Sequence, residues 1–227
     1  MRHKNIVMMF FLFVIMVCVC KQYKNIQSAV NTMLSVDRRV IVIDAGHGGW
    51  DPGKAGTTGK NEKDLNLEIA KKLQMLLETG GATVIIIREE DEALGESKRK
   101  DMKERKATAE EAEADMLISI HQNSFPQAGV KGAQVFYYNG SEEGKKLSEY
   151  IQARLKSDLD NTNQRQAKAN TDYYILKNIL VPTALVECGF LSNSNEEALL
   201  NTEGYQQKVA WSIYLGIEDY FEACGKN

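Results

Sequence analysis

The chain has 227 residues, 43% of them hydrophobic and 26% charged, a composition typical of one globular domain of good size. Its 28 basic and 31 acidic residues give a net charge of -3. The sequence therefore lacks the excess of positive charge that is typical of nucleic-acid-binding proteins, and we expect no nucleic-acid partner.

The amino-terminal segment differs from the rest of the chain. Basic residues precede an uninterrupted apolar run over residues 6–20, and lysines follow it. This pattern predicts that residues 1–24 are a signal peptide or a signal anchor and that residues 25–38 are a tether. The run spans only about 22 Å as a helix, which favours a cleaved signal, whereas the lack of a small-x-small site favours an uncleaved anchor. We expect an exported protein at the outer face of the cytoplasmic membrane or in the cell wall, with membrane attachment through this segment.

Two cysteines lie outside that segment, Cys188 and Cys224. They are too few for a disulfide-rich scaffold. One disulfide and two unpaired thiols are both compatible with the sequence. Unpaired thiols are favoured, because Cys188 follows a strand-like run and should be largely buried.

The first strong pattern of the domain is V-I-V-I-D-A-G-H-G-G over residues 40–49. Four β-branched residues predict a buried strand, and the glycines predict a sharp turn that projects His47 from the end of the strand. Six glycines fall within residues 45–63, without the spacing of a phosphate-binding loop. On this stretch alone, a core histidine and a site histidine are equally good interpretations of His47.

The remainder of the domain alternates between helical and strand patterns, with a polar stretch over 161–170 that we interpret as a mobile wall. Such alternation predicts an α/β fold, a single domain whose central, mostly parallel (mixed) sheet is flanked by helices. The expected helices cover residues 61–79, 97–114, 141–159, 195–200 and 205–221, and the later strands cover 83–87, 116–120, 132–138 and 183–186.

Two further strands end in residues whose side chains can bind a metal ion or take part in catalysis. His121 follows one strand as His47 follows the first, and Glu187 follows another. Because the carboxyl ends of neighbouring strands meet at one edge of an open α/β sheet, we expect these side chains to share a cleft. A carboxylate at the end of a buried strand suits a general base, although Glu187 could equally form a structural ion pair, for example with Arg88.

Glu62 stands at the start of the first predicted helix. A carboxylate there is also favoured by the helix dipole alone, which is the simpler interpretation. Together, however, His47, Glu62 and His121 form the two-nitrogen, one-oxygen set that catalytic zinc sites use.

Four motifs, read together, resemble one known family. They are D-A-G-H-G-G-x-D-P-G at 44–53, E-K-D-L-N-L at 62–67, S-I-H-Q-N-S at 119–124 and L-V-E-C-G-F-L-S-N at 185–193. Their order and content resemble the zinc-dependent N-acetylmuramoyl-L-alanine amidases of the Amidase_3 type, from about residue 40 to residue 221.

The resemblance implies a role for each motif residue. His47, Glu62 and His121 match the ligands of one zinc ion, and Glu187 matches the catalytic glutamate. The implied reaction is hydrolysis of the amide bond between N-acetylmuramic acid and L-alanine in peptidoglycan. A catalytic domain over residues 39–222, with a tail over 223–227, is the organisation that follows.

Three further residues are candidates for substrate binding: Asn123, Arg88 and Arg105. Asn123 also fits a simple cap at the end of its strand. Arg105 aligns with an arginine of the family, but Glu110 stands where relatives have asparagine, and Gln122 replaces an alanine. These departures leave the substrate contacts open.

A leader followed by one catalytic domain, without cell-wall-binding repeats, resembles the sporulation amidases of endospore-forming bacteria. These prepare cortex peptidoglycan for muramic-lactam formation, which would place the protein between the forespore membranes. A vegetative cell-wall autolysin and a non-catalytic peptidoglycan-binding regulator with the same fold are the alternatives. A domain without binding repeats has little means of holding a polymer, so an activating protein partner of unknown identity is a further expectation.

Overall fold

The computed structural model describes residues 12–13, 15–23, 35–57, 59–177 and 179–225. Most of the predicted tether and the first eleven residues of the predicted leader lie outside them. The described leader residues are helical. In the part of the chain that the structure describes, no helix combines the length and the apolar character needed to cross a membrane.

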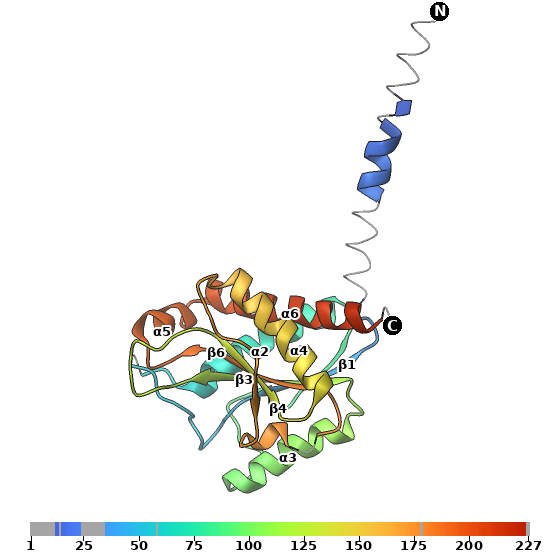
Figure 1. Cartoon of the computed structure of the whole chain (residues 1–227). Helices are drawn as coiled ribbons and strands as arrows, with labels where there is room; N and C mark the ends of the chain where they lie inside the picture. The colour runs from blue at the N-terminus through green and yellow to red at the C-terminus, as the bar shows by residue number, and fades with distance from the viewer. Residues whose placement is uncertain (1–11, 14, 24–34, 58, 178, 226–227) are drawn as a thin grey trace, which may run out of the picture.

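The folded domain alternates strands and helices, as its sequence pattern predicts (Figure 1). In chain order the elements are β1 (Val40–Ala45), α2 (Glu62–Thr79), β2 (Thr83–Ile86), α3 (Lys98–Glu111), β3 (Met116–Asn123), β4 (Gln134–Tyr138), α4 (Glu142–Asp158), β5 (Lys168–Asn170), η1 (Tyr174–Leu176), β6 (Thr183–Phe190), α5 (Ser194–Leu200) and α6 (Glu203–Cys224).

The six strands form one mixed sheet in the order β2-β1-β3-β6-β4-β5. The first four of these run parallel to one another, and β4 pairs antiparallel to β6. The predicted fold class is therefore confirmed. One strand was missed: β5 lies within the polar stretch expected to be a mobile wall, and it pairs parallel with β4.

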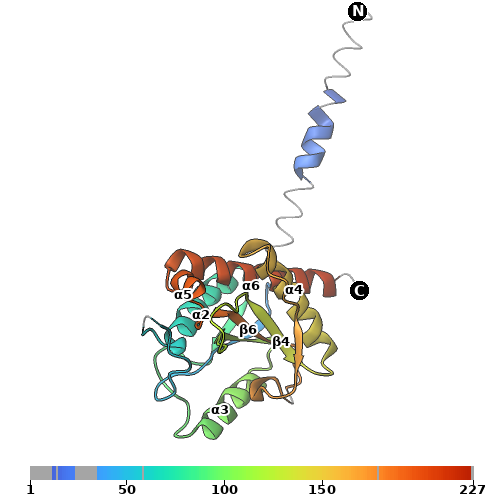
Figure 2. The same ribbon diagram turned by 60° about the vertical axis from the view of Figure 1, so that its left-hand side comes forward.

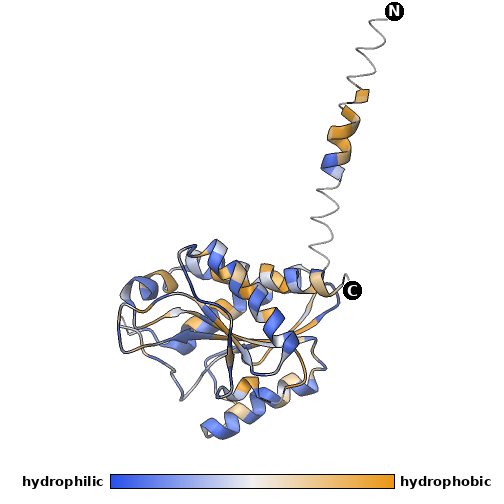
Figure 3. Cartoon of the chain, viewed as in Figure 1, coloured by the Kyte–Doolittle hydropathy of each residue, from blue (hydrophilic) through white to orange (hydrophobic). Residues whose placement is uncertain are grey.

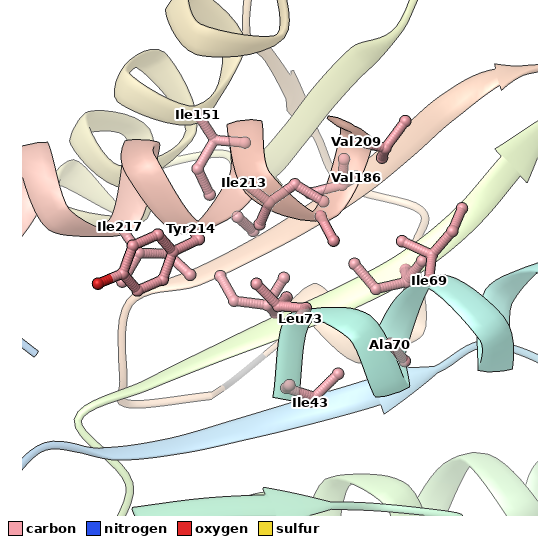
Figure 4. Close-up of a cluster of buried hydrophobic side chains, with 14 of the residues drawn as sticks. Ile43, Ile69, Ala70, Leu73, Ile151, Val186, Val209, Ile213, Tyr214 and Ile217 are labelled. Atoms are coloured by element: carbon pink, nitrogen blue, oxygen red, sulfur yellow. The ribbon is translucent and has the colours of Figure 1, made fainter. Parts of the chain in front are cut away.

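Alternate residues of the central strands enter two separate cores. Ile41 and Ile43 of β1 face α2, α4 and α6 on one side of the sheet, while Val42 faces α3 and η1 on the other. Figures 1 and 2 show these two layers from two directions. The larger core is drawn in Figure 4, where Ile69, Leu73, Val209 and Ile213 from the helices meet Ile43 and Val186 from the sheet.

Helix α3 is markedly hydrophilic, as Figure 3 shows. Its buried positions are few, namely Asp101, Arg105 and Ala109. Two of these three are charged. Arg105 pairs with Asp44 of β1 and with Asp101 of α3 itself, and it lies beneath the loop that follows β1.

The packed domain begins before the predicted boundary at residue 39. Val36 is fully buried in the larger core, and the amide of Arg38 donates to the carbonyl of Gly81 over 3.1 Å. The sequence did not signal this because residues 35–39 lack strand or helix periodicity. Cys188 is buried and Cys224 exposed, and both are free thiols, as favoured above.

Candidate active site

The loop after β1 presents His47 in a backbone conformation that few residues adopt. His47 has φ of 63°, and Gly48 beside it has φ of 139°. The left-handed region is costly for a side chain with a β-carbon, and such residues concentrate at functional sites. Gly46 fixes the start of the loop, because its amide donates to the carbonyl of Ile120 in β3 over 3.0 Å.

Arg88, expected as a substrate contact, is buried beneath this loop. Its Nε donates to the carbonyl of Ala45 over 2.8 Å, and its other two nitrogens donate to the carbonyls of Gly46, Lys63 and Glu90. All three nitrogens thus have backbone partners, and the side chain does not line the cavity described below. Its contacts hold the loop in place.

Arg105 supports the same loop from α3. It donates to the carbonyl of His47 over 2.6 Å, and its guanidinium pairs with Asp44 and Asp101, each at 2.6 Å. The Asp44 carboxylate also accepts the hydroxyl of Ser119. Buried charges are tolerated only when paired and hydrogen-bonded in this way. The side chain is 1% exposed although it borders the cavity described below, and its three nitrogens are all hydrogen-bonded within the protein.

Glu62 is the first residue of α2 and is 4% exposed. Its Oε2 accepts the amide of Lys54 over 2.8 Å, and its Oε1 accepts the amide of Gln122 over 3.1 Å. Burial opposes ionisation of the carboxyl, but hydrogen bonds from the two histidine side chains outweigh this effect and lower the pKa of Glu62 below its ordinary value. Glu62 therefore carries a negative charge.

The two imidazoles converge on that carboxylate. Nδ1 of His121 lies 3.0 Å, and Nε2 of His47 lies 3.2 Å, from Oε1 of Glu62. All three donor atoms lie within 4.8 Å of one another. Among the residues that the structure describes, these three form the one cluster of His, Cys, Asp and Glu side chains placed to hold a metal ion.

Two glycines keep the space around these donors open. A β-carbon on Gly46 would lie 2.2 Å from Cε1 of His121, and one on Gly53 would lie 2.6 Å from Oε2 of Glu62 and 2.8 Å from Cδ2 of His47. No side chain fits at either position without moving a donor. The glycine-rich loop is therefore shaped around the three side chains.

Asp51 was not singled out in the sequence as a site residue. Its Oδ2 lies 2.9 Å from Nδ1 of His47, the ring nitrogen that faces away from Glu62. The amide of Gly53 donates to the other oxygen over 3.1 Å. Such a carboxylate behind a histidine fixes the orientation of the ring when its far nitrogen binds a metal ion.

Glu187 lies in the middle of β6 rather than at its end, and His121 likewise lies within β3. The two residues are register partners on adjacent strands. Burial raises the pKa of Glu187 to about 7. Its Oε1 accepts the hydroxyl of Tyr173 over 3.4 Å, while its Oε2 is buried without a hydrogen-bond partner in the described residues. The alternative of an ion pair with Arg88 is not realised.

These side chains line one cavity of about 460 Å³. Its lining includes His47, His121, Glu62 and Glu187. It also includes Asn123, which was expected there. Asn123 is half-buried and its Oδ1 accepts the amide of Ser124 over 2.8 Å, so it also acts as a cap at the strand end. Tyr173 is a lining residue that sequence reasoning missed.

Comparison with known proteins agrees with this geometry. The model of one protein family, described as N-acetylmuramoyl-L-alanine amidase (Amidase_3), matches residues 41–219. The chain belongs to this family. It is therefore an N-acetylmuramoyl-L-alanine amidase, a hydrolase of peptidoglycan, and the predicted family and enzyme class are confirmed.

Several relatives of this amidase resemble it over nearly their whole length. It is 42% identical to the germination-specific N-acetylmuramoyl-L-alanine amidase of Bacillus subtilis, over 90% of this chain and 89% of that protein. The CwlD amidase of Clostridioides difficile, solved in complex with the GerS lipoprotein, superposes with a TM-score of 0.80 at 42% identity, over 82% of this chain and 100% of that one. The amidase AmiC2 of Nostoc punctiforme superposes with a TM-score of 0.73 at 30% identity, over 81% and 97%.

Proposed function

We propose that this amidase hydrolyses the bond between N-acetylmuramic acid and L-alanine with the help of one zinc ion held by His47, Glu62 and His121. The observation that carries the proposal is the convergence of these three donor atoms in the same cavity as Glu187. Two imidazole nitrogens and one carboxylate oxygen are a zinc donor set, and three protein ligands leave a position for reactants. The two glycines keep the space between the donors free.

Zinc bound there would acidify a water molecule and stabilise negative charge on the substrate's carbonyl oxygen. Glu187 would accept the proton of the water as the water oxygen bonds to the carbonyl carbon, and would return that proton to the amine of L-alanine as the carbon–nitrogen bond breaks. The unpartnered Oε2 is the oxygen available for this transfer. Burial raises the pKa of Glu187, which favours a carboxyl group that serves first as base and then as acid.

Several residues around the site orient the proposed metal ligands and do not bind the substrate. We assign Asp51 to the orientation of His47, and Arg88 and Arg105 to the support of the loop that carries it, because both guanidinium groups are used by the protein itself. Asn123, at the cavity wall, remains our candidate for a contact to substrate.

The biological setting we propose is the maturation of spore cortex. The germination-specific relative in Bacillus subtilis shares 42% of its residues over 90% of this chain, which supports cortex peptidoglycan as the substrate. We further propose that the protein is exported through its amino-terminal segment and acts outside the cytoplasmic membrane, in a sporulating cell between the forespore membranes. A relative solved with the GerS lipoprotein supports an accessory protein as partner.

The test is product analysis with the full-length chain. Peptidoglycan from spore cortex and from vegetative walls is incubated with the protein and zinc, with and without an accessory lipoprotein, and the products are identified by mass spectrometry. We expect free stem peptides that begin with L-alanine, released preferentially from cortex. Equal release from vegetative walls would favour an autolysin, and no release under any condition would contradict the amidase mechanism.

The matched variant is Glu187→Gln, which preserves the shape of the side chain and removes its basicity. We expect it to keep stoichiometric zinc and to lose turnover by about 100-fold to 10,000-fold, the usual contribution of a general acid–base group. Turnover within a few-fold of the unmodified protein would remove Glu187 from the catalytic role.

A further inference from the structure

Tyr173 stands next to the proposed general base, and the motifs that carry the family resemblance do not include it. Its hydroxyl lies 3.4 Å from Oε1 of Glu187, and both side chains line the same cavity. The distance is long for a hydrogen bond between two oxygens. In enzymes without substrate, however, hydrogen bonds of catalytic groups are often long and tighten when the substrate binds.

The ring of Tyr173 is held in place from two directions. Phe136 of β4 packs edge-on against it, with ring centroids 5.4 Å apart and an interplanar angle of 86°. The backbone is fixed as well, because Oδ1 of Asn170 accepts the amides of Asp172 and Tyr173 over 2.7 and 2.8 Å. Asn170 itself ends β5 and is paired with β4. Tyr173 thus lies in a short segment after β5 that is tied to the sheet through Asn170.

The hydroxyl remains a donor at any working pH. Burial, together with the negative charge of Glu187, raises the pKa of Tyr173 to about 12. A phenol that stays protonated can only donate its proton to a carboxylate oxygen that accepts it. The two oxygens of Glu187 therefore differ: one faces a permanent donor and the other, Oε2, is buried without a partner in the described part of the chain.

We propose that Tyr173 is a positioning residue for the reaction: by holding Oε1, it fixes the carboxylate of Glu187 so that Oε2 receives the proton of the attacking water. Without a hydrogen bond to hold it, the carboxylate of a glutamate rotates about its Cγ–Cδ bond. A general base that is out of position makes the reaction much slower. One directed hydrogen bond from a rigid ring removes this rotation. The inference rests on the proposed role of Glu187 and adds a requirement to it.

The competing explanation is that Tyr173 only forms the cavity wall. Its ring belongs to the smaller core on the α3 side of the sheet, so a purely structural role would reside in the ring rather than in the oxygen. Tyr173→Phe separates the two roles, because it keeps the ring and its contact with Phe136 and removes only the hydroxyl. Tyr138→Phe is the matched control, since Tyr138 packs against the same core and does not line the cavity.

The experiment measures kcat and KM of the full-length chain on a soluble muramoyl peptide, together with zinc content and the midpoint of thermal unfolding. We expect Tyr173→Phe to lower kcat about 10-fold to 100-fold, the range of a hydrogen bond to a charged group, with KM, zinc content and unfolding midpoint unchanged. Tyr138→Phe should leave kcat unchanged.

A kcat for Tyr173→Phe within two-fold of the unmodified protein would overturn the inference, and so would a change confined to KM. If Glu187→Gln is inactive in the same assay while Tyr173→Phe is fully active, only the inference fails and the proposed function stands. If Glu187→Gln is active, the proposed catalytic role of Glu187 fails and the inference fails with it.

Discussion

Gly46→Ala is the substitution whose effect on the metal site can be derived most directly from the structure. A β-carbon at this position would lie 2.2 Å from Cε1 and 2.3 Å from Nε2 of His121. The backbone of Gly46 has little freedom to yield, because its amide donates to Ile120 and its carbonyl accepts from Asn66 and Arg88. Gly46 does not have a positive φ, so alanine is compatible with its backbone and only the imidazole must move.

The size of that movement determines how much zinc affinity we expect the variant to lose. Ordinary contact begins at 3.4 Å, so the ring of His121 must shift by about 1.2 Å. Metal–ligand distances tolerate deviations of only about 0.2 Å, so His121 would cease to be a ligand. Loss of a residue that merely orients a ligand costs about 10-fold to 100-fold in metal affinity. We therefore expect Gly46→Ala to weaken zinc binding by at least about 100-fold, or ~2.7 kcal/mol.

The assay is competition for zinc between the protein and a chelating dye, with circular dichroism to confirm the fold. Gly129→Ala serves as the control, because a β-carbon there would meet no atom within 4 Å and Gly129 has no positive φ. We expect the control to bind zinc like the unmodified protein. Unchanged zinc affinity in a folded Gly46→Ala variant would refute the placement of His121 in the site.

Three further predictions follow from named contacts. Asp51→Asn should weaken zinc binding about 10-fold to 100-fold in the same competition assay, because His47 loses the charge that orients its ring; unchanged affinity would contradict that role. Arg105→Ala should lower the free energy of unfolding in urea by about 3–5 kcal/mol, because it leaves Asp44 buried without its cation; a loss below about 1 kcal/mol would show that the pair is not needed. Burial raises the pKa of Glu218 to about 7 from 4.5, so between these pH values the folded chain keeps a proton that the unfolded chain has released, and stability falls as pH rises. Glu218→Gln should therefore raise the midpoint of thermal unfolding, and the rise should be larger at pH 8 than at pH 5. An equal rise at both pH values would show that the pKa of Glu218 is not raised in the folded protein.

The sequence predicted those parts of the molecule that local pattern determines. The run of residues 40–43 is apolar on both faces, as in a strand that is covered on both sides, so the central sheet could be predicted. The convergence of His47 and His121 could be predicted because the two residues come from neighbouring parallel strands whose ends meet at one edge. Glu187 lines the same cavity although β6 continues past it to Phe190.

The remaining features depend on tertiary partners that no local pattern encodes. The sequence makes Arg88 a candidate for substrate binding, whereas the fold supplies four backbone carbonyls for its guanidinium. Tyr173 was missed because its position depends on β5, a three-residue strand of Lys, Ala and Asn without strand propensity. Val36 was assigned to the tether because a single apolar residue shows no periodicity.

A crystal structure of the zinc-loaded protein, with data at the zinc absorption edge, tests whether three side chains hold one zinc ion beside Glu187. We predict one anomalous peak bonded to Nε2 of His47, a carboxylate oxygen of Glu62 and Nδ1 of His121, with Glu187 unbonded to the metal in the same cavity. A peak held by other residues, or no peak in protein that hydrolyses peptidoglycan, would contradict the account.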